Sequence, residues 1–171
     1  ADFTFPATAN VVVQQGATPV LVDIDLDTFT VNVDDLRRKI TPKTKAIIPV
    51  DAFGCAANYD SILKVAAEHN LPVIEDAATA IGTKYYGRFC GNLTTLGCFS
   101  FHPRKAITMG EGGIITTNDS KIDQRLRSLR NHGLDMENPI SDFVEPGFNY
   151  RITEFQAAMG NTQMGKLERI I

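Results

Sequence analysis

The chain has 171 residues, of which 43% are hydrophobic and 22% charged, a composition typical of one ordinary globular unit with a real core. Its 17 basic and 20 acidic residues give a formal net charge of −3 without any basic stripe, so nucleic acid is not an expected partner. No apolar run approaches the roughly 18 residues of a membrane span, so a membrane is not expected as a partner either.

Apolar, β-branched runs alternate with amphipathic segments along the chain. In chain order, the spacing predicts a helix over residues 8–16, a strand over 19–22, a helix over 33–40, a strand over 44–50, a helix over 60–70, strands over 72–74, 97–101 and 114–117, and helices over 120–133 and 152–171. We therefore expect an α/β fold of three layers, α/β/α, with right-handed crossovers.

The predicted strands are almost continuously apolar, which is typical of a mostly parallel sheet covered on both faces. Residues 114–117 follow the preceding strand through a glycine-rich loop without a helix, so they are predicted to form the one antiparallel strand. Residues 133–146, which carry Asn138, Pro139 and Pro146, are predicted to be the most flexible segment.

The cysteines and histidines do not indicate a metal site. The three cysteines are Cys55, Cys90 and Cys98. They are odd in number and lack CxxC spacing, so we expect reduced thiols in a cytoplasmic protein, not a disulfide framework or a zinc site. The three histidines are equally scattered, and no metal is expected.

Lys105 is the residue that points most directly to chemistry. It follows the strand predicted over 97–101, and open α/β sheets bind their ligands at the carboxyl ends of their strands. A lysine in such a crevice loses its charge more easily than on an open surface, and the neutral amine can condense with an aldehyde. Pyridoxal phosphate is the aldehyde that fits the rest of the chain.

Asp76 and Ser100 are the candidate partners of Lys105. A carboxylate at Asp76 would keep a pyridine nitrogen protonated, although an Asp after a strand often caps the next helix instead. The Ser100 hydroxyl would bind a phosphate oxygen, although a serine in a strand often bonds only to neighbouring backbone. The turn at 110–113 matches neither a dinucleotide fingerprint nor a P-loop, and no GxSxG motif is present.

Several motifs together carry a family resemblance. They are TFPATAN from residue 4, PVLVDID from 19, TKAIIPV from 44, VIEDAA from 73, SFHPRK from 100, GEGG from 110, RNHG from 130 and NYR from 149. In order and spacing, the chain closely resembles the DegT family of sugar-nucleotide aminotransferases. These are pyridoxal-phosphate enzymes of the aspartate aminotransferase fold, fold type I.

The resemblance implies a role for each site residue. Lys105 would bond to the cofactor aldehyde and later carry the proton, Asp76 would pair with the pyridine nitrogen, and Ser100 would bind the phosphate. Phe5 would lie against the pyridine ring, where stacking contributes about 1 kcal/mol. Asn149 would reach the phosphate of a neighbouring subunit's cofactor, which implies a homodimer with shared sites.

Two positions depart from the family pattern. Thr79 stands where relatives usually have Gln or His, in the position that supports the cofactor ring and its phenolic oxygen. Met109 stands where a Thr is common. The chain also begins and ends within patterned sequence, so we expect residues 1–171 to be the central part of the cofactor-binding large domain, without an N-terminal segment and a C-terminal small domain.

The reaction that the resemblance implies is transfer of an amino group, usually from glutamate, to a nucleotide-linked keto-sugar for amino-sugar or polysaccharide biosynthesis. Two alternatives stay open. A pyridoxal-phosphate sugar dehydratase commonly has histidine in place of the lysine, so Lys105 argues against it. A non-catalytic regulatory homologue would require none of Lys105, Asp76 and Ser100.

Overall fold

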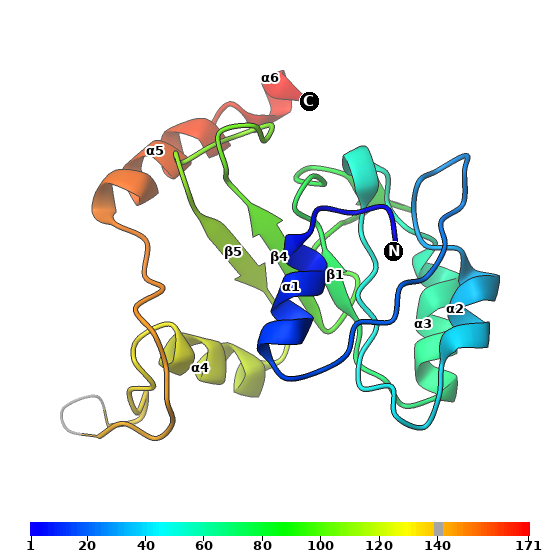
Figure 1. Ribbon diagram of the computed structural model, residues 1–171. Coiled ribbons are helices and arrows are strands. Elements are labelled where there is room, and N and C mark those ends of the chain that lie inside the picture. The colour runs from blue at the N-terminus through cyan, green and yellow to red at the C-terminus, as the bar shows by residue number, and fades with distance from the viewer. Residues whose placement is uncertain (139–141) are drawn as a thin grey trace.

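A mixed sheet of three strands lies at the centre of the chain (Figure 1). Its order is β1 (Ile74–Asp76), β4 (Leu96–Ser100), β5 (Gly113–Thr116). The β1 and β4 strands are parallel and β5 is antiparallel to β4, as predicted. The computed structural model describes residues 1–138 and 142–171, so the predicted flexible segment 133–146 lies partly outside the described residues.

The segment predicted as a strand over 44–50 lies beside β1 but forms only two isolated parallel bridges, Ile47 to Val73 and Val50 to Asp76. Pro49 explains the interruption. It accepts a hydrogen bond from the Asp76 N–H at 2.9 Å but has no N–H with which to continue the ladder.

One other strand prediction was wrong, and one hairpin was missed. Residues 19–22 form no strand, and Val20 and Leu21 are 63% and 52% exposed, because no strand among the described residues lies beside them. A short hairpin of β2 (Lys84–Tyr85) and β3 (Arg88–Phe89) was not predicted. Its turn is formed by Tyr86 and Gly87, both with positive φ, the geometry that two-residue hairpins favour.

Helices cover both faces of the sheet, which confirms the predicted α/β class (Figure 1). The helices are α1 (Ala7–Gln14), α2 (Val33–Lys39), α3 (Tyr59–Glu68), α4 (Ser120–Leu129), α5 (Glu154–Met164) and α6 (Leu167–Ile170), with a 3₁₀ turn η1 at Ala52–Gly54. Each predicted helix is present and ends earlier than predicted, and the one predicted over 152–171 is divided into α5 and α6. Thr153 begins α5 with a capping box, in which its hydroxyl accepts the Gln156 N–H and the Gln156 side chain accepts the Thr153 N–H.

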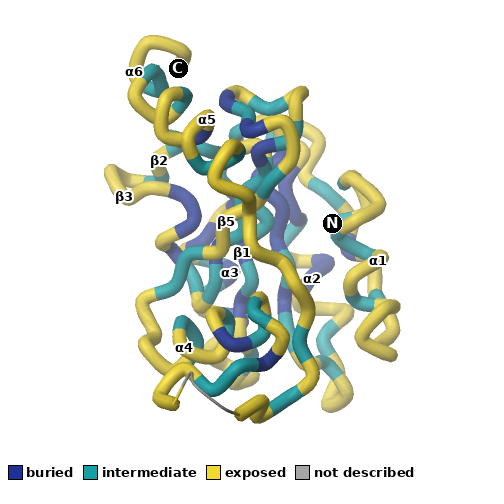
Figure 2. The backbone as a smooth tube through the Cα atoms, turned by 90° about the vertical axis from the view of Figure 1, so that its left-hand side faces the viewer, coloured by how far each residue is buried: buried dark blue, intermediate teal, exposed yellow. Residues whose placement is uncertain are grey.

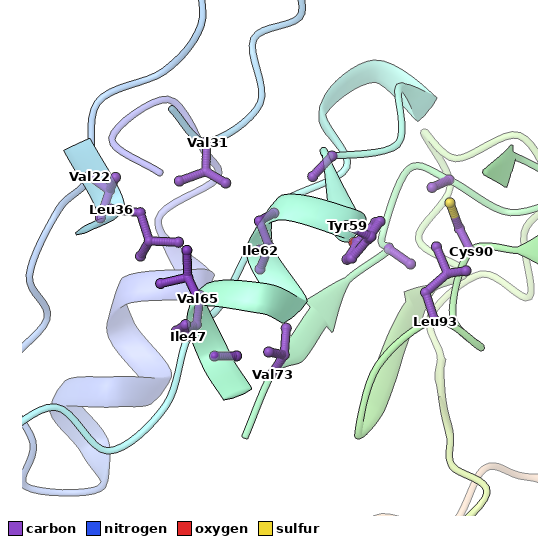
Figure 3. Close-up of a cluster of buried hydrophobic side chains, with 14 residues drawn as sticks. Val22, Val31, Leu36, Ile47, Tyr59, Ile62, Val65, Val73, Cys90 and Leu93 are labelled. Carbon is purple, nitrogen blue, oxygen red and sulfur yellow. The ribbon is translucent and has the colours of Figure 1, made fainter. Parts of the chain in front are cut away.

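The main core lies between the sheet and helices α2 and α3 (Figure 3). Ile62 and Val65 of α3 are fully buried and pack in one cluster with Ile47 and Val73. Burial of one such side chain stabilises the fold by about 1.5–3 kcal/mol. By contrast, α1 and α6 contain no buried residue, and α5 has only Gly160 (Figure 2).

None of the helices in residues 1–138 and 142–171 has both the length and the apolar character that a membrane crossing requires.

Candidate functional site

Asp76 lies at the carboxyl end of β1, half-buried beneath the start of α1. Its Oδ2 accepts a hydrogen bond of 2.7 Å from the Thr8 hydroxyl, and its Oδ1 accepts the Ala78 N–H at 3.2 Å. The Thr8 hydroxyl donates its proton to Asp76. In the 2.9 Å hydrogen bond between the Thr4 and Thr8 hydroxyls, Thr4 is therefore the donor. A turn and not a helix follows Asp76, so Asp76 does not cap a helix there.

Ser100 lies at the carboxyl end of β4 on the same face of the sheet as Asp76. The parallel register pairs Asp76 with Cys98, and side chains two residues apart on a strand share a face. The Ser100 hydroxyl accepts the His102 N–H at 3.3 Å, and Gly113, its partner in β5, has no side chain to cover it. Ser100 thus bonds to neighbouring backbone while its proton finds no acceptor in the described residues.

Cys98 pairs with Asp76 across the two strands and lies two residues before Ser100 on β4, so its thiol is on the same face as both. Burial raises its pKa, and the nearby carboxylates of Asp76 and Glu75 raise it further. The thiol therefore stays neutral beside Asp76.

Lys105 lies, half-buried, in the loop that follows β4. The loop is closed by bonds from the Phe101 N–H to Gly112 O at 2.9 Å and from the Met109 N–H to Phe101 O at 3.0 Å. Phe101, Ile107 and Met109 form a second buried cluster beneath it. A tight turn, in which the Lys105 N–H donates to His102 O at 2.9 Å, fixes the backbone at the lysine.

Phe5 and Thr79 lie near this edge of the sheet; the side chain of Phe5 is exposed, whereas that of Thr79 is held by a hydrogen bond. Phe5 is 68% exposed and stands just before α1, whose Thr8 holds Asp76. The hydroxyl of Thr79 donates to Asp51 O at 2.8 Å. That proton is therefore already used within the chain.

Asn149 is the one predicted site residue that the chain does not bring to this edge. It forms an antiparallel bridge with Asn131, just after α4, and its side chain accepts the Arg151 N–H at 3.4 Å. Figure 1 shows this segment beside α4, at the end of the sheet opposite to Ser100.

Sequence reasoning missed two features of this region. The first is Thr8, which supports Asp76 and lies in the TFPATAN motif. The second is a buried group of Asp51, Glu75 and Cys90 on the opposite face of β1, whose ligand-type atoms all lie within 4.8 Å of one another. The signal for the second was Glu75, an acidic residue at a position where the strand pattern requires burial.

The donor set at the sheet edge fits pyridoxal phosphate. Each oxygen of Asp76 accepts a single bond and has a lone pair left for a pyridinium N–H. Ser100 has a hydroxyl proton left for a phosphate oxygen, and Lys105 supplies an amine.

Comparisons with known proteins agree with this chemistry. The model of the DegT/DnrJ/EryC1/StrS aminotransferase family matches residues 1–171. The chain is 48% identical over 167 residues to the GDP-perosamine synthase of Caulobacter vibrioides, a match covering 98% of this chain and 45% of that protein.

Two solved structures are similar along nearly the whole chain. The aminotransferase from Psychrobacter cryohalolentis has a TM-score of 0.94 at 35% identity, covering 97% of this chain and 45% of that one. The protein Spr1654 from Streptococcus pneumoniae, in its PLP form, has a TM-score of 0.88 at 31% identity, covering 97% of this chain and 47% of that one. The chain thus spans about half the length of the relatives that it matches.

Proposed function

The chain belongs to the DegT/DnrJ/EryC1/StrS aminotransferase family, whose cofactor is pyridoxal phosphate, and from that premise we propose that it supplies the central part of the cofactor-binding domain of a sugar aminotransferase. The enzyme transfers an amino group, with glutamate as the proposed donor, to the keto carbon of a nucleotide-linked sugar. The product class is amino sugars for polysaccharide biosynthesis. The 48% identity to a GDP-perosamine synthase supports a nucleotide-sugar substrate.

One observation carries the proposal. Asp76 and Ser100 lie on one face at the carboxyl ends of two parallel strands, and the loop directly after the second strand holds Lys105. These three side chains come from positions that a fold without this activity would not need to fill with a carboxylate, a hydroxyl and an amine.

Each of the proposed site residues would have its own role in binding the cofactor or in moving the proton. Asp76, oriented by Thr8, would keep the pyridine nitrogen protonated, and Ser100 would donate to the phosphate. When bound, pyridoxal phosphate supplies an electron-withdrawing ring that stabilises negative charge on the carbon next to the transferred nitrogen. The Nζ of Lys105, when free, would accept a proton from the carbon of the amino donor and return it at the cofactor carbon. Phe5 would cover one face of the ring.

The proposed assembly is a homodimer with shared sites. Asn149 lies away from Asp76 and Ser100 within the chain and is exposed, which supports a role at a site on another copy. We also propose a cytoplasmic location, which the three free thiols support.

The test of the proposal uses the full-length protein with pyridoxal phosphate. We expect a visible absorbance band that borohydride reduction removes, and mass spectrometry of the reduced protein should find the cofactor mass on the peptide containing Lys105. The band should be absent from Lys105→Ala and present in Lys84→Ala, because Lys84 lies over the Phe89 ring in the β2–β3 hairpin, away from this loop. A band and transaminase activity that persist in Lys105→Ala would show that another residue is the nucleophile.

Glutamate distinguishes the enzyme from a regulatory homologue, because it should convert the cofactor to its amine form only in a catalytic protein. A dehydratase would differ in its sugar product, which would gain no nitrogen. Nucleotide-linked sugars with guanosine, uridine and thymidine diphosphate can then be compared by how far each raises the melting temperature of the amine form.

A further inference from the structure

Two carboxyl groups lie fully buried behind Asp76, on the opposite face of the sheet. Asp51 and Glu75 are both 0% exposed, and no lysine, arginine or histidine within residues 1–138 and 142–171 forms an ion pair with either. They lie near Tyr59 and Cys90, two residues at one end of the main core that Figure 3 labels. Burial of an uncompensated charge is costly, so this arrangement requires a physical explanation.

Each carboxyl group has one satisfied and one unsatisfied oxygen. Asp51 Oδ1 accepts the Ala57 N–H at 2.9 Å and the Tyr59 hydroxyl at 2.8 Å, and a Glu75 oxygen, Oε1, accepts the Gly91 N–H. Asp51 Oδ2 and Glu75 Oε2 have no partner among the described residues although both are buried. The two side chains offer ligand-type oxygens within 4.8 Å of each other.

A single proton shared by the two carboxyl groups removes the cost of burying two unpaired charges. Placed on one of the two unsatisfied oxygens and donated to the other, it satisfies both atoms with one O–H···O bond and leaves one negative charge instead of two. The Ala57 N–H, the Tyr59 hydroxyl and the Gly91 N–H, which donate to the other oxygens of the pair, stabilise that remaining charge. A metal ion would additionally require the Cys90 thiolate, and burial together with the two neighbouring acids raises the pKa of that thiol.

We propose that Asp51 and Glu75 share one proton, and that this acid pair is a positioning device for the cofactor-facing edge of β1. The pair itself is independent of the proposed function, whereas its effect on cofactor binding rests on it.

The bonds around the pair connect it directly to the site residues. Glu75 precedes Asp76 in β1, and the Asp51 N–H donates to Asp76 O at 3.0 Å. The Asp51 carbonyl accepts the Thr79 hydroxyl at 2.8 Å. If the shared proton is lost, repulsion between the two carboxylates pushes apart the segments that hold Asp76 and Thr79.

The groups that face the pair do not titrate in its place. Tyr59 faces it from α3 and Cys90 from the segment after β3, and burial raises the pKa of both, so both stay neutral. On the β4 side, Gly97 pairs with Glu75 and has no side chain. Burial raises the pKa of Asp51, and it raises that of Glu75 to about 7.

The direction of the pH dependence follows from these raised values. A carboxyl whose pKa is higher in the folded than in the unfolded state contributes stability that is complete below the unfolded value and is lost as the pH rises through the folded value. The contribution of the pair to stability should therefore be complete below about pH 4.5, the ordinary value for a glutamate, and be lost as the pH rises from there through about 7.

The first experiment needs no variant. Infrared spectra of the full-length protein without cofactor should contain a protonated-carboxyl C=O band at pH 6, where exposed carboxyls are ionised, and the band should disappear as the pH rises to about 8.5. No such band at pH 6 would overturn the proposal. So would a stoichiometric metal ion in the purified protein that is lost in Cys90→Ser.

The second experiment compares melting temperatures between pH 6 and 8.5. Glu75→Gln keeps an N–H donor for Asp51 and cannot ionise, so its melting temperature should fall by about 2–4 °C less than that of the wild type over this range. Glu68→Gln, at an exposed ion pair with Arg37, should follow the wild type. Identical profiles for Glu75→Gln and the wild type would overturn the proposal.

The positioning role has a separate readout. The dissociation constant for pyridoxal phosphate should rise several-fold more between pH 6 and 8.5 in the wild type than in Glu75→Gln. Equal rises, with the infrared band present, would remove the positioning role. Failure of the proposed function would instead appear as no Lys105-dependent cofactor band at any pH, with the infrared and melting results unchanged.

Discussion

The hydroxyl of Thr8 ties α1 to the carboxylate that is proposed to meet the cofactor nitrogen. At 2.7 Å it is a short hydrogen bond to Asp76 Oδ2, and bonds to a charged acceptor contribute about 1.5–3 kcal/mol. We predict that Thr8→Val, which keeps the side-chain shape but removes this donor, raises the dissociation constant for pyridoxal phosphate by about tenfold or more. Titration of the apoenzyme with pyridoxal phosphate, followed by absorbance, measures this dissociation constant.

The matched control is Thr162→Val. Among the described residues its hydroxyl bonds to Ala158 O within α5 and to no other group, so the dissociation constant should stay unchanged. If both variants weaken cofactor binding equally, the Thr8 bond has no special role in orienting Asp76.

At the scale of elements, the large side chain of Met109 in the Lys105 loop packs against α5. Met109 is 4% exposed, and a Cβ added to Gly160 of α5 would lie only 2.4 Å from its Sδ and 3.0 Å from its Cγ. A Cβ at Gly112 would lie 2.5 Å from the Met109 Cε, so the side chain is confined on both sides. Glycine at position 160 therefore leaves the room that the Met109 side chain occupies.

We predict that Gly160→Ala lowers the free energy of unfolding by about 1–3 kcal/mol, because the added methyl group overpacks this contact. Urea unfolding measures the change. Gly165→Ala is the control, since its Cβ would meet nothing closer than 3.7 Å, and it should be neutral or stabilising. In a Met109→Ala background the cost of Gly160→Ala should disappear, and a cost that persists would contradict the contact.

The elements that local pattern predicted well are those whose formation depends on their own residues. Helices with N-terminal caps such as Asn58, Asp119 and Thr153 begin within two residues of the predicted starts, although they end earlier than predicted. A strand also needs a neighbour, which an apolar run cannot supply. Residues 19–22 have the composition of a strand but no partner among the described residues, and Pro49 breaks a ladder that composition alone favoured.

The same distinction applies to the candidate site. Asp76, Ser100 and Lys105 could be proposed as site residues from the sequence because the first two end parallel strands and Lys105 lies in the loop after the second, and the carboxyl ends of parallel strands meet at one edge. The bond from Thr8 to Asp76 and the approach of Asp51 to Glu75 join residues far apart in sequence. Such contacts depend on how the layers pack, so no local pattern revealed them.

At the scale of the whole molecule, large aromatic side chains remain exposed on the segment around Asn149 and on α5. Phe148 and Tyr150 stack at 5.2 Å and are 65% and 71% exposed, and Phe155 is 89% exposed. Exposed apolar surface of this kind is typical of a face that another part of an assembly covers. Its position around Asn149 supports the proposal that this face meets a second copy.

The shared-site proposal makes a prediction that mixing two impaired variants can test. Lys105→Ala should lack activity because it lacks the proposed nucleophile, and Asn149→Ala should be weakened because it no longer reaches its partner's cofactor phosphate. After the two full-length variants are mixed in equal amounts and their subunits exchange, half of the dimers are mixed. Each mixed dimer contains one site with both native residues, so about one quarter of wild-type activity should return.

If Asn149 instead acts within its own chain, no site in the mixed dimer combines a native Lys105 with a native Asn149, and activity should not rise above the sum of the separate variants. The rise should also require exchange, so variants mixed immediately before the assay provide the control. Light scattering of each variant must still show a dimer, because loss of assembly would also prevent recovery. Recovery after exchange alone therefore places Lys105 and Asn149 at one site from two different subunits.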